Sequence, residues 1–274
     1  MMEAAGLVIL CLLLVSLLGV LCWILWRPLD AASVSLVTGG AHSSEASEIP
    51  RLLHQTWKRA SPLPDKYRTC QESWKRLNPD LEYRFHDDSD CEQLVRRHYP
   101  QYLGTYLDMD EPVERADMFR YMAIHHYGGI YADMDTTCRR QLHPLFTPED
   151  RVVVAVEKDQ PGQHQLLQWC FAARAGQPVF LRILDEIVVR HNFLKGKPVP
   201  STHRDDMVIW KTGPGVFTEQ LLRAKKEDDA AVTIHPRCTF GAYDLSAACL
   251  RKAYLVHHFD GSWKAQWEER FKLW

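Results

Sequence analysis

The sequence lacks the hallmarks of several protein classes. Its 274 residues carry a net charge of only −2, with basic and acidic side chains interspersed, so no basic run is available for a nucleic-acid backbone. None of its eight cysteines forms a closely spaced CxxC pair, which argues against a zinc site. Neither Asn78 nor Asn192 lies in an N-glycosylation sequon. We therefore expect a small ligand or a glycan as partner, and no nucleic acid.

An apolar run near the start of the chain predicts a membrane anchor. Residues 4–26 form an almost unbroken stretch of about 23 apolar residues, enough to cross the roughly 30 Å hydrocarbon core as a helix. A signal peptide is less favoured, because the preceding flank carries Glu3 and no Lys or Arg, and because the run exceeds a usual signal core. The flanking charges do not determine the orientation of this helix. Residues 27–48 are rich in Ser, Ala, Gly and Thr without periodicity, which predicts a flexible stem before a folded domain at 49–274.

The cysteines beyond the apolar run leave two interpretations open. The domain is large enough for a sizeable hydrophobic core, since 46% of the chain is hydrophobic. Six cysteines in such a domain are compatible with up to three disulfides, or with buried free thiols. These are Cys70, Cys91, Cys138, Cys170, Cys238 and Cys249.

The stretch from 111 to 140 organises the chain. Pro112 suits the first turn of a helix, and the double glycine at 128–129 supplies the backbone freedom that ends one. Side chains then alternate as in a strand, so that Asp133 and Asp135 point in the same direction. Two unpaired carboxylates would repel each other, so we expect a divalent cation shared with a phosphate-bearing ligand.

The other segments alternate between strand and helix patterns. This alternation predicts an α/β fold, in which ligands gather at the carboxyl ends of the strands. The predicted strands are 51–57, 81–85, 151–156, 207–210, 232–234 and 254–256. The predicted helices are 66–77, 91–99, 112–127, 163–173, 179–190 and one opened by Thr-Gly-Pro-Gly at 212–215.

Several polar residues admit both a structural and a functional interpretation. Asp87, Asp88 and Asp90 look like a metal cluster, but they precede a helix, where carboxylates cap backbone amides, and we favour capping. Asp117 and Arg120 lie three residues apart on a helix. They form either a surface ion pair of little energetic value or a pair that holds a ribose and an anionic group.

Two further stretches carry aromatic and basic side chains. Trp57 follows the first strand, and its residue type alone favours a core position. Residues 255–267 read LVHHFDGSWKAQW, which places an imidazole, a close backbone approach and a cation just after a strand. We hold a structural and a ligand-binding role for this second stretch as equally supported.

Together these segments resemble glycosyltransferase family 32, the group with a sugar-binding region containing a DXD motif. Initiating α-mannosyltransferases and inositol phosphorylceramide mannosyltransferases belong to it. The central motif is highly specific, whereas a bare DXD is common by chance. The matching residues are 49–58, 115–135, 212–215 and 257–263.

The resemblance implies a GT-A, Rossmann-like domain that binds a nucleotide-sugar and transfers its sugar with retention of configuration. Asp133 and Asp135 match the DXD pair, which engages Mn²⁺ or Mg²⁺ and, through it, the donor diphosphate. Asp117 and Arg120 match positions that contact the ribose or sugar of the donor. Trp57 matches a tryptophan that stacks near the nucleoside base, which reverses the core assignment made from residue type alone.

The tail is similar to the HFxGxxK segment of the neighbouring family 8 galactosyltransferases. There the histidine ligates the metal, and the glycine and lysine contact the diphosphate. This implies His258 as the third metal ligand, with His257 as the alternative because the register between the families is open. The donor-binding residues of the segment are then Gly261, Ser262, Trp263 and Lys264.

The activity implied is that of a membrane-anchored, metal-dependent glycosyltransferase. It would move a hexose, with mannose favoured over galactose and N-acetylglucosamine, from a nucleotide-sugar to a glycan or a glycolipid such as a sphingolipid. Because a retaining enzyme of this kind does not require one, we assign no Asp or Glu as a general base. The resemblance, together with the order of anchor, stem and domain, implies a type II protein with its catalytic domain in the Golgi lumen.

Two alternatives compete with this interpretation. Asp-Met-Asp-Thr-Thr at 133–137 also fits the DxDx[TV] signature of haloacid-dehalogenase-like phosphatases, with Asp205 and Asp206 as a later metal-binding pair. That signature normally follows a longer apolar strand near the start of a domain, and here a helix and two glycines precede it. The third interpretation is a catalytically silent sugar-binding protein.

Overall fold

The computed structural model describes residues 48–160, 163–198, 200–241 and 246–261. The expected anchor at 4–26 and the stem up to residue 47 lie outside these ranges, so both stay predictions. Within the described part of the chain, no helix combines the length and the apolar character that a membrane span requires.

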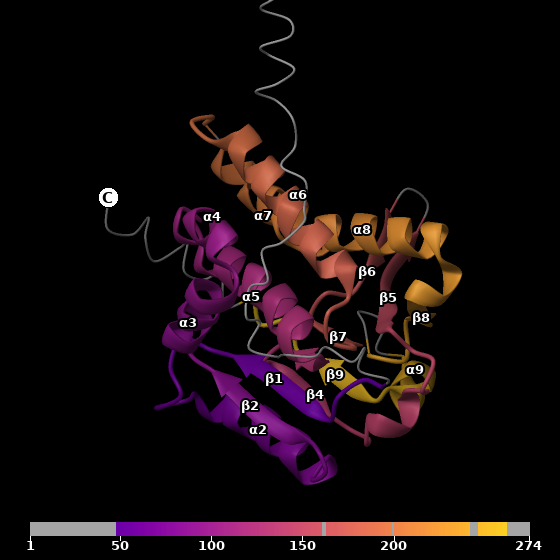
Figure 1. The fold of residues 1–274 in the computed structure, drawn as a ribbon. Coiled ribbons are helices and arrows are strands. Elements are labelled where there is room, and N and C mark those ends of the chain that lie inside the picture. The colour runs from indigo at the N-terminus through magenta and orange to yellow at the C-terminus, as the bar shows by residue number, and fades with distance from the viewer. Residues whose placement is uncertain (1–47, 161–162, 199, 242–245, 262–274) are drawn as a thin grey trace, which may run out of the picture. The chain divides into compact units, whose positions relative to one another are not determined.

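A mixed seven-stranded sheet forms the centre of the described residues (Figure 1). Its order is β2-β1-β3-β7-β5-β6, and β8 also pairs with β5. Strands β1, β2, β3, β5 and β8 run in the same direction, because β7 is antiparallel to both β3 and β5. A separate two-stranded sheet pairs β4 with β9. The strands are β1 (Leu52–Thr56), β2 (Glu82–His86), β3 (Gly129–Ala132), β4 (Thr136–Cys138), β5 (Val152–Gln160), β6 (Gln163–Leu166), β7 (Cys170–Ala173), β8 (Thr233–His235) and β9 (Leu255–His257).

Helices flank the central sheet. The α-helices are α2 (Asp65–Leu77), α3 (Asp88–His98), α4 (Leu103–Leu107), α5 (Pro112–Tyr127), α6 (Pro178–Leu194), α7 (Arg204–Lys211), α8 (Pro214–Glu227) and α9 (Ala247–Lys252). Short 3₁₀ segments are η1 (Pro100–Tyr102), η2 (His143–Leu145), η3 (Ser201–His203) and η4 (Asp229–Ala231).

Helix α5 begins and ends as the sequence predicts. Pro112 occupies its first turn, and Glu111 and Glu114 form a reciprocal capping box. Gly128 ends the helix with a positive φ of 67°, where a side chain would be strained. A Cβ at Gly128 would also lie 2.7 Å from the amide nitrogen of Ala175. The glycine therefore permits both the turn and the close approach of the following chain.

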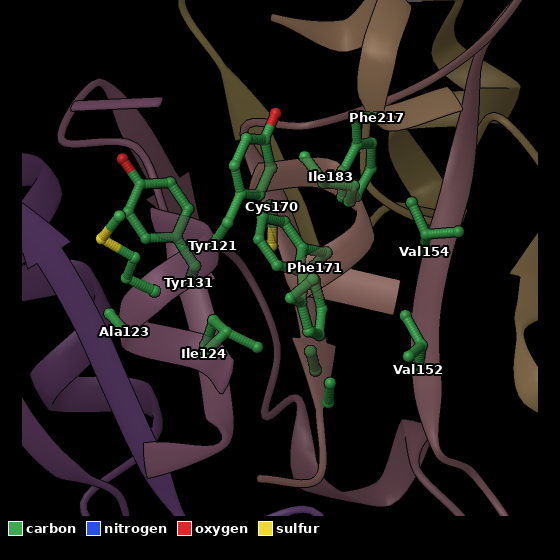
Figure 2. Packing of buried hydrophobic residues seen from close by; sticks show 14 of the residues in the cluster. Tyr121, Ala123, Ile124, Tyr131, Val152, Val154, Cys170, Phe171, Ile183 and Phe217 are labelled. Atoms are coloured by element: carbon green, nitrogen blue, oxygen red, sulfur yellow. The ribbon is translucent and has the colours of Figure 1, made fainter. Parts of the chain in front are cut away.

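The core beside α5 is aromatic (Figure 2). Tyr121 of α5 and Phe217 of α8 pack on Phe171 of β7, with ring centroids 6.3 and 5.0 Å from it. Ile183 of α6 joins this cluster, and all four side chains are fully buried. Each such burial contributes roughly 1.5–3 kcal/mol, so α5 is held firmly against the sheet. Its polar residues are thereby fixed in position.

The predicted α/β class is confirmed, but two segments were assigned the wrong element. Residues 163–173 form strands β6 and β7 rather than a helix, because residues 170–173 pair with β3 on one side and β5 on the other. Residues 207–210 lie in helix α7 rather than in a strand. There Val208 and Lys211, three residues apart, share the buried face, and the Lys211 ammonium forms an ion pair with Glu114 2.7 Å away.

The acidic cluster before α3 has the capping role that we favoured. The Asp87 carboxylate accepts a hydrogen bond from the amide of Asp90, and the Asp90 carboxylate accepts one from the amide of Asp87. Asp88 lies in the first turn of the helix, where negative charge suits the helix dipole.

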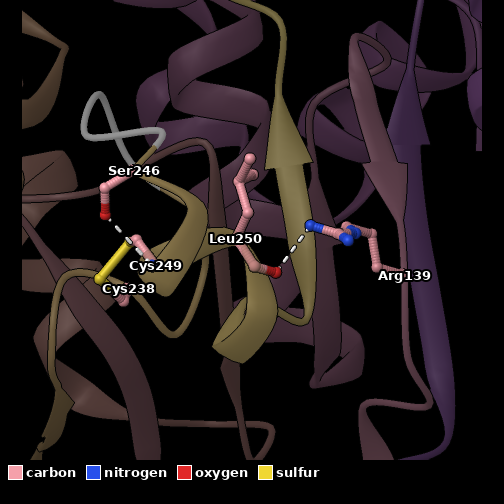
Figure 3. The surroundings of a disulfide bond; sticks show 5 residues. All are labelled: Arg139, Cys238, Ser246, Cys249 and Leu250. Atoms are coloured by element: carbon pink, nitrogen blue, oxygen red, sulfur yellow. Dashed lines mark hydrogen bonds between the residues drawn. A yellow bond between two sulfur atoms is a disulfide. The ribbon is translucent and has the colours of Figure 1, made fainter.

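The cysteines divide between the two interpretations left open. Cys238 and Cys249 form a disulfide, which connects α9 to the segment after β8 (Figure 3). Ser246 caps α9 by accepting a hydrogen bond from the amide of Cys249, and Arg139 donates to the carbonyl of Leu250 at 2.7 Å. These contacts fix the start of β9. The buried free thiols among the described residues are those of Cys70, Cys91, Cys138 and Cys170.

Candidate functional site

The carboxyl ends of three parallel strands meet at one cavity. Trp57 follows β1, Asp133 follows β3, and Glu157 lies near the end of β5. All three line a cavity of about 360 Å³. The cavity therefore lies at the edge of the sheet where the sequence predicted a ligand.

The turn after β3 is anchored through its backbone. The amide of Asp133 donates to the carbonyl of Trp169 at 2.8 Å. The carbonyl of Asp133 accepts hydrogen bonds from the side chains of Gln55 (3.1 Å) and Thr136 (2.6 Å). Because both backbone groups are bound, the direction in which the two aspartates leave the strand is fixed.

The two aspartates differ in their electrostatic surroundings. Burial raises the pKa of Asp133, and the Arg120 guanidinium acts in the opposite direction. Burial would also raise the pKa of Asp135, but the hydrogen bond and charge of His257 and the amide of Asp260 bring that pKa below its usual value. Asp135 is thus the better prepared of the two to stay ionised.

Asp133, Asp135 and His257 form a cluster suited to a cation. Their ligand atoms all lie within 4.8 Å of one another. The Nε2 atom of His257 lies 3.0 Å from Asp135 Oδ1, and its buried Nδ1 atom has no hydrogen-bond partner. Two carboxylates select hard divalent cations such as Mn²⁺ and Mg²⁺, and an imidazole completes a mixed oxygen and nitrogen set. These residues fit the expected metal ion.

The structure places His257, and not His258, in this cluster. Residue 257 pairs with Thr136 in the ladder between β9 and β4, and its ring stacks on Trp169 at 4.5 Å. His258 points to the opposite side, where its ring nitrogen lies 2.7 Å from Thr137 Oγ1 at the surface. The cluster therefore contains His257, the alternative left open by the sequence, in place of the expected His258.

The two histidines can be separated by substitution. We expect His257→Ala to weaken Mn²⁺ binding by at least about 100-fold. Loss of a residue that only supports a metal ligand weakens metal binding by about 10- to 100-fold, and His257 is itself a candidate ligand. His258→Ala is the matched control and should change Mn²⁺ affinity less than about threefold. Titration of each purified variant with Mn²⁺, followed by electron paramagnetic resonance, measures both. A larger loss in the His258 variant would reverse the assignment.

Asp117 and Arg120 form a buried ion pair that extends to the cluster. The Arg120 Nη2 atom lies 3.1 Å from Asp117 Oδ1 and 3.3 Å from Asp133 Oδ1, and the Arg120 and Asp117 side chains are only 6% and 3% exposed. Thr212 donates a hydrogen bond to Asp117 at 2.7 Å. Burial raises the pKa of Asp117 to about 6, although Arg120 and Thr212 oppose it. The pair is therefore buried, and it is not the surface ion pair of little energetic value that the sequence also allowed.

The remaining predicted residues fall into three groups. Trp57 and Gly261 line the cavity, and the Trp57 ring packs on Tyr67 with centroids 4.4 Å apart. Asp205 and Asp206, the metal pair of the phosphatase alternative, belong neither to the cluster nor to the cavity wall. Residues outside the described ranges are Ser262, Trp263 and Lys264.

Sequence reasoning missed several residues that line the cavity, and two of them carry polar groups beside the cluster. Glu157 and Trp169 both line the cavity, and each is 5% exposed or less. The predicted strand 151–156 stopped one residue before Glu157, which is a carboxylate that directly follows a buried apolar run. That position at the end of the predicted strand was the available signal, although β5 continues to residue 160. Trp169 lay in the segment wrongly assigned to a helix, and nothing in the sequence marked it.

Comparison with known proteins identifies a segment that contains part of this site, including Asp117, Arg120, Asp133 and Asp135. Residues 64–153 match the family described as "Glycosyltransferase sugar-binding region containing DXD motif". This confirms the resemblance inferred from the sequence.

Two of the relatives found, both named mannosyltransferases, show how far the likeness extends. Inositol phosphoceramide mannosyltransferase 3 of Schizosaccharomyces pombe is 38% identical over 105 residues, which cover 38% of this chain and 29% of that protein. Initiation-specific alpha-1,6-mannosyltransferase of Candida albicans is 27% identical over 209 residues, covering 65% of this chain and 54% of that protein. The chain therefore spans less than a third of the first relative and about half of the second.

Solved structures share the fold. The ligand-free glycosyltransferase domain of the YGT toxin superposes with a TM-score of 0.54 at 8% identity, covering 69% of this chain and 80% of that domain. The UDP-bound form of the same domain gives 0.51 over the same shares. The described residues thus have a GT-A-like glycosyltransferase fold.

Proposed function

We propose that this protein is a metal-dependent, retaining glycosyltransferase that moves mannose from a nucleotide-sugar to a glycan or glycolipid. The observation that carries the proposal is the cluster of Asp133, Asp135 and His257, which opens into the same cavity as Trp57. The match of residues 64–153 to the DXD family supports the same activity.

Each part of the cavity wall suits one part of such a donor. Asp133, Asp135 and His257 would hold Mn²⁺ or Mg²⁺, which would neutralise charge on the donor diphosphate. Trp57 offers an aromatic face to the nucleoside base. Asp117, with its carboxylate oriented by Thr212, offers acceptor oxygens to the ribose or sugar.

Arg120 acts mainly through Asp133. Its guanidinium lies between the Asp117 and Asp133 carboxylates and donates to the carbonyl of Gln168 at 3.2 Å. A positive charge held in a buried position stabilises the negative charge that develops on a departing nucleoside diphosphate. It also keeps the side chain of Asp133 directed at the cluster.

The names of the relatives supply the donor and the acceptor to test first. Both relatives described above are named mannosyltransferases, so GDP-mannose is the first donor to test. The name of the first relative specifies inositol phosphoceramide, which makes a sphingolipid the first acceptor to test. The apolar run at 4–26 supports a membrane anchor, and a type II orientation in the Golgi membrane, with the domain in the lumen, completes the proposal.

A donor screen on the full-length chain tests this function. The purified protein is incubated with GDP-mannose, UDP-galactose, UDP-glucose or UDP-N-acetylglucosamine, with Mn²⁺ or with a chelator, and released nucleoside diphosphate is measured. We expect GDP-mannose to be turned over at least about tenfold faster than the others, and the chelator to remove the activity. Adding inositol phosphoceramide should accelerate release.

The alternatives give different results in the same assay. Hydrolysis of simple phosphoesters through a phosphorylated Asp133 would favour the phosphatase. Binding of a nucleotide-sugar without turnover would favour the silent homologue. Absence of metal-dependent binding to every donor would contradict the proposed function.

A further inference from the structure

Glu157 is directed into the cavity by an irregularity in β5. Pairing of β5 with β6 matches Val156 to Leu166 and Lys158 to Gln165, so the register shifts at Glu157. Such a β-bulge places an extra residue on one strand and re-aims its side chain, and bulges are common beside functional sites. The Glu157 side chain accordingly lines the cavity that also contains Asp133 and His257.

The carboxylate of Glu157 is buried among neutral hydrogen-bond donors. The residue is 4% exposed. Its Oε1 atom accepts a hydrogen bond from the indole of Trp169 at 3.1 Å, and its Oε2 atom accepts one from the amide of Gln165. Burial raises its pKa, and the two hydrogen bonds and the charges of His257 and Lys158 only partly oppose this effect.

A structural role alone does not account for a carboxylate at this position. A buried carboxylate held by neutral donors loses more hydration energy than a neutral amide of the same shape. Glutamine would satisfy Trp169 and Gln165 equally well, because both amides can rotate to match donor and acceptor. The negative charge gains further where an additional hydrogen-bond donor approaches from the cavity. Each carboxylate oxygen can accept more than the single bond it has here.

Trp169 connects Glu157 to the cation cluster. The same indole that donates to Glu157 stacks on His257, with centroids 4.5 Å apart and planes inclined by 29°. Trp169 is 5% exposed and therefore rigidly held. Glu157 thus has a fixed position relative to the residues that would hold a diphosphate. A sugar bonded to that diphosphate presents its hydroxyl groups within the same cavity.

From this geometry we infer that Glu157 binds hydroxyl groups of the transferred sugar and determines which sugar the protein accepts. The inference rests on the proposed function. A carboxylate and a sugar hydroxyl form a charge-assisted hydrogen bond, which is stronger than a neutral one. Hydroxyl stereochemistry distinguishes one hexose from another, so a fixed acceptor can discriminate between them.

The test compares binding of a nucleoside diphosphate with binding of the complete nucleotide-sugar. Full-length wild-type protein and the variant Glu157→Gln are titrated with GDP and with GDP-mannose in the presence of Mn²⁺, and turnover of GDP-mannose is measured. We expect GDP affinity to change less than about twofold. Affinity for GDP-mannose should fall by about 10- to 100-fold, with a matching fall in turnover, because one charge-assisted bond is lost.

A matched variant controls for removal of a buried carboxylate. Asp150 precedes the same strand, is 5% exposed, and accepts hydrogen bonds from the amide of Thr147 and the hydroxyl of Thr233, but it does not line the cavity. Asp150→Asn should leave both affinities and turnover unchanged. Where Glu157→Gln does not fold, Glu157→Asp keeps the charge, shortens its reach, and should show the same selective loss.

The possible outcomes separate this inference from the function on which it rests. Wild-type protein that binds neither GDP-mannose nor any of the three UDP-sugars overturns the proposed function and this inference together. Wild-type binding of GDP-mannose with equal affinity and turnover in Glu157→Gln overturns this inference alone. An equal loss of GDP and GDP-mannose affinity also overturns it, because Glu157 would then act through His257 rather than on the sugar.

Discussion

Asp135→Asn is expected to abolish metal-dependent donor turnover while leaving the fold intact. Asparagine keeps the shape of the side chain and can still accept the hydrogen bond from the amide of Asp260. It removes the negative charge that His257 and the backbone amide of Asp260 stabilise. The cluster then keeps only one of its two carboxylates. Loss of a cation worth several kcal/mol to the reaction corresponds to roughly a 1,000-fold fall in turnover.

Two measurements test Asp135→Asn. Donor turnover is measured against Mn²⁺ concentration, and thermal unfolding shows whether the variant is folded. The matched control is Asp87→Asn, because asparagine caps a helix about as well as aspartate does. That variant should retain wild-type turnover. An Asp135→Asn protein with normal Mn²⁺-dependent turnover would remove Asp135 from the site, whereas an unfolded variant would indicate that the carboxylate is mainly structural.

Among the substitutions proposed for this protein, Arg120→Met is expected to lower the free energy of unfolding the most. The guanidinium lies between the buried carboxylate of Asp117 and the partly buried carboxylate of Asp133, and a methionine would leave both without their cation. Breaking a buried ion pair from one side lowers the free energy of unfolding by about 3–5 kcal/mol. Denaturant unfolding at neutral pH measures this loss.

The pH dependence of the same variant provides a second readout. Asp117 has a folded-state pKa of about 6, above its usual value, and loss of Arg120 raises that pKa further. A carboxyl group with a raised folded-state pKa binds its proton more tightly in the folded protein, so stability increases as the pH falls through that pKa. The loss of unfolding free energy caused by Arg120→Met should therefore be smaller at pH 5.5 than at pH 7.5.

An exposed ion pair supplies the control for Arg120. Arg182 and Glu227 form a pair whose side chains are 35% and 48% exposed. Exposed pairs contribute about 0–1 kcal/mol, so Arg182→Met should be nearly neutral at both pH values. Equal free energies of unfolding for the two variants would contradict the view that Arg120 neutralises buried carboxylates.

The parts of the site that the sequence predicted are those encoded by local signals. Pro112 and the double glycine at 128–129 bound a helix by backbone chemistry alone, and the structure has α5 between them. Asp133 and Asp135 follow the strand directly, so their proximity needs no knowledge of distant contacts. The predicted strand alternation included both aspartates, but β3 ends at residue 132 and the aspartates lie in the turn beyond it.

The parts that could not be predicted depend on partners distant in sequence. Residues 170–173 are Cys-Phe-Ala-Ala, and their strand conformation comes from pairing with β3 and β5 on either side. Short apolar runs of this kind have no periodicity that separates helix from strand. The choice between His257 and His258 likewise depends on the register of β9 against β4. A one-residue slip would exchange their faces, and the tail sequence does not specify that register.

The pairing of β9 with β4 has a consequence for the order in which the protein folds. All strands of the seven-stranded sheet come from residues 52–235, so this sheet can form before β9 leaves the ribosome, since synthesis proceeds from the N-terminus. His257 arrives 122 positions after Asp135 and joins it only when β9 closes on β4. A nascent chain would thus carry two aspartates with no histidine beside them. Completion of this three-residue cluster would then report that the chain has been synthesised past β9.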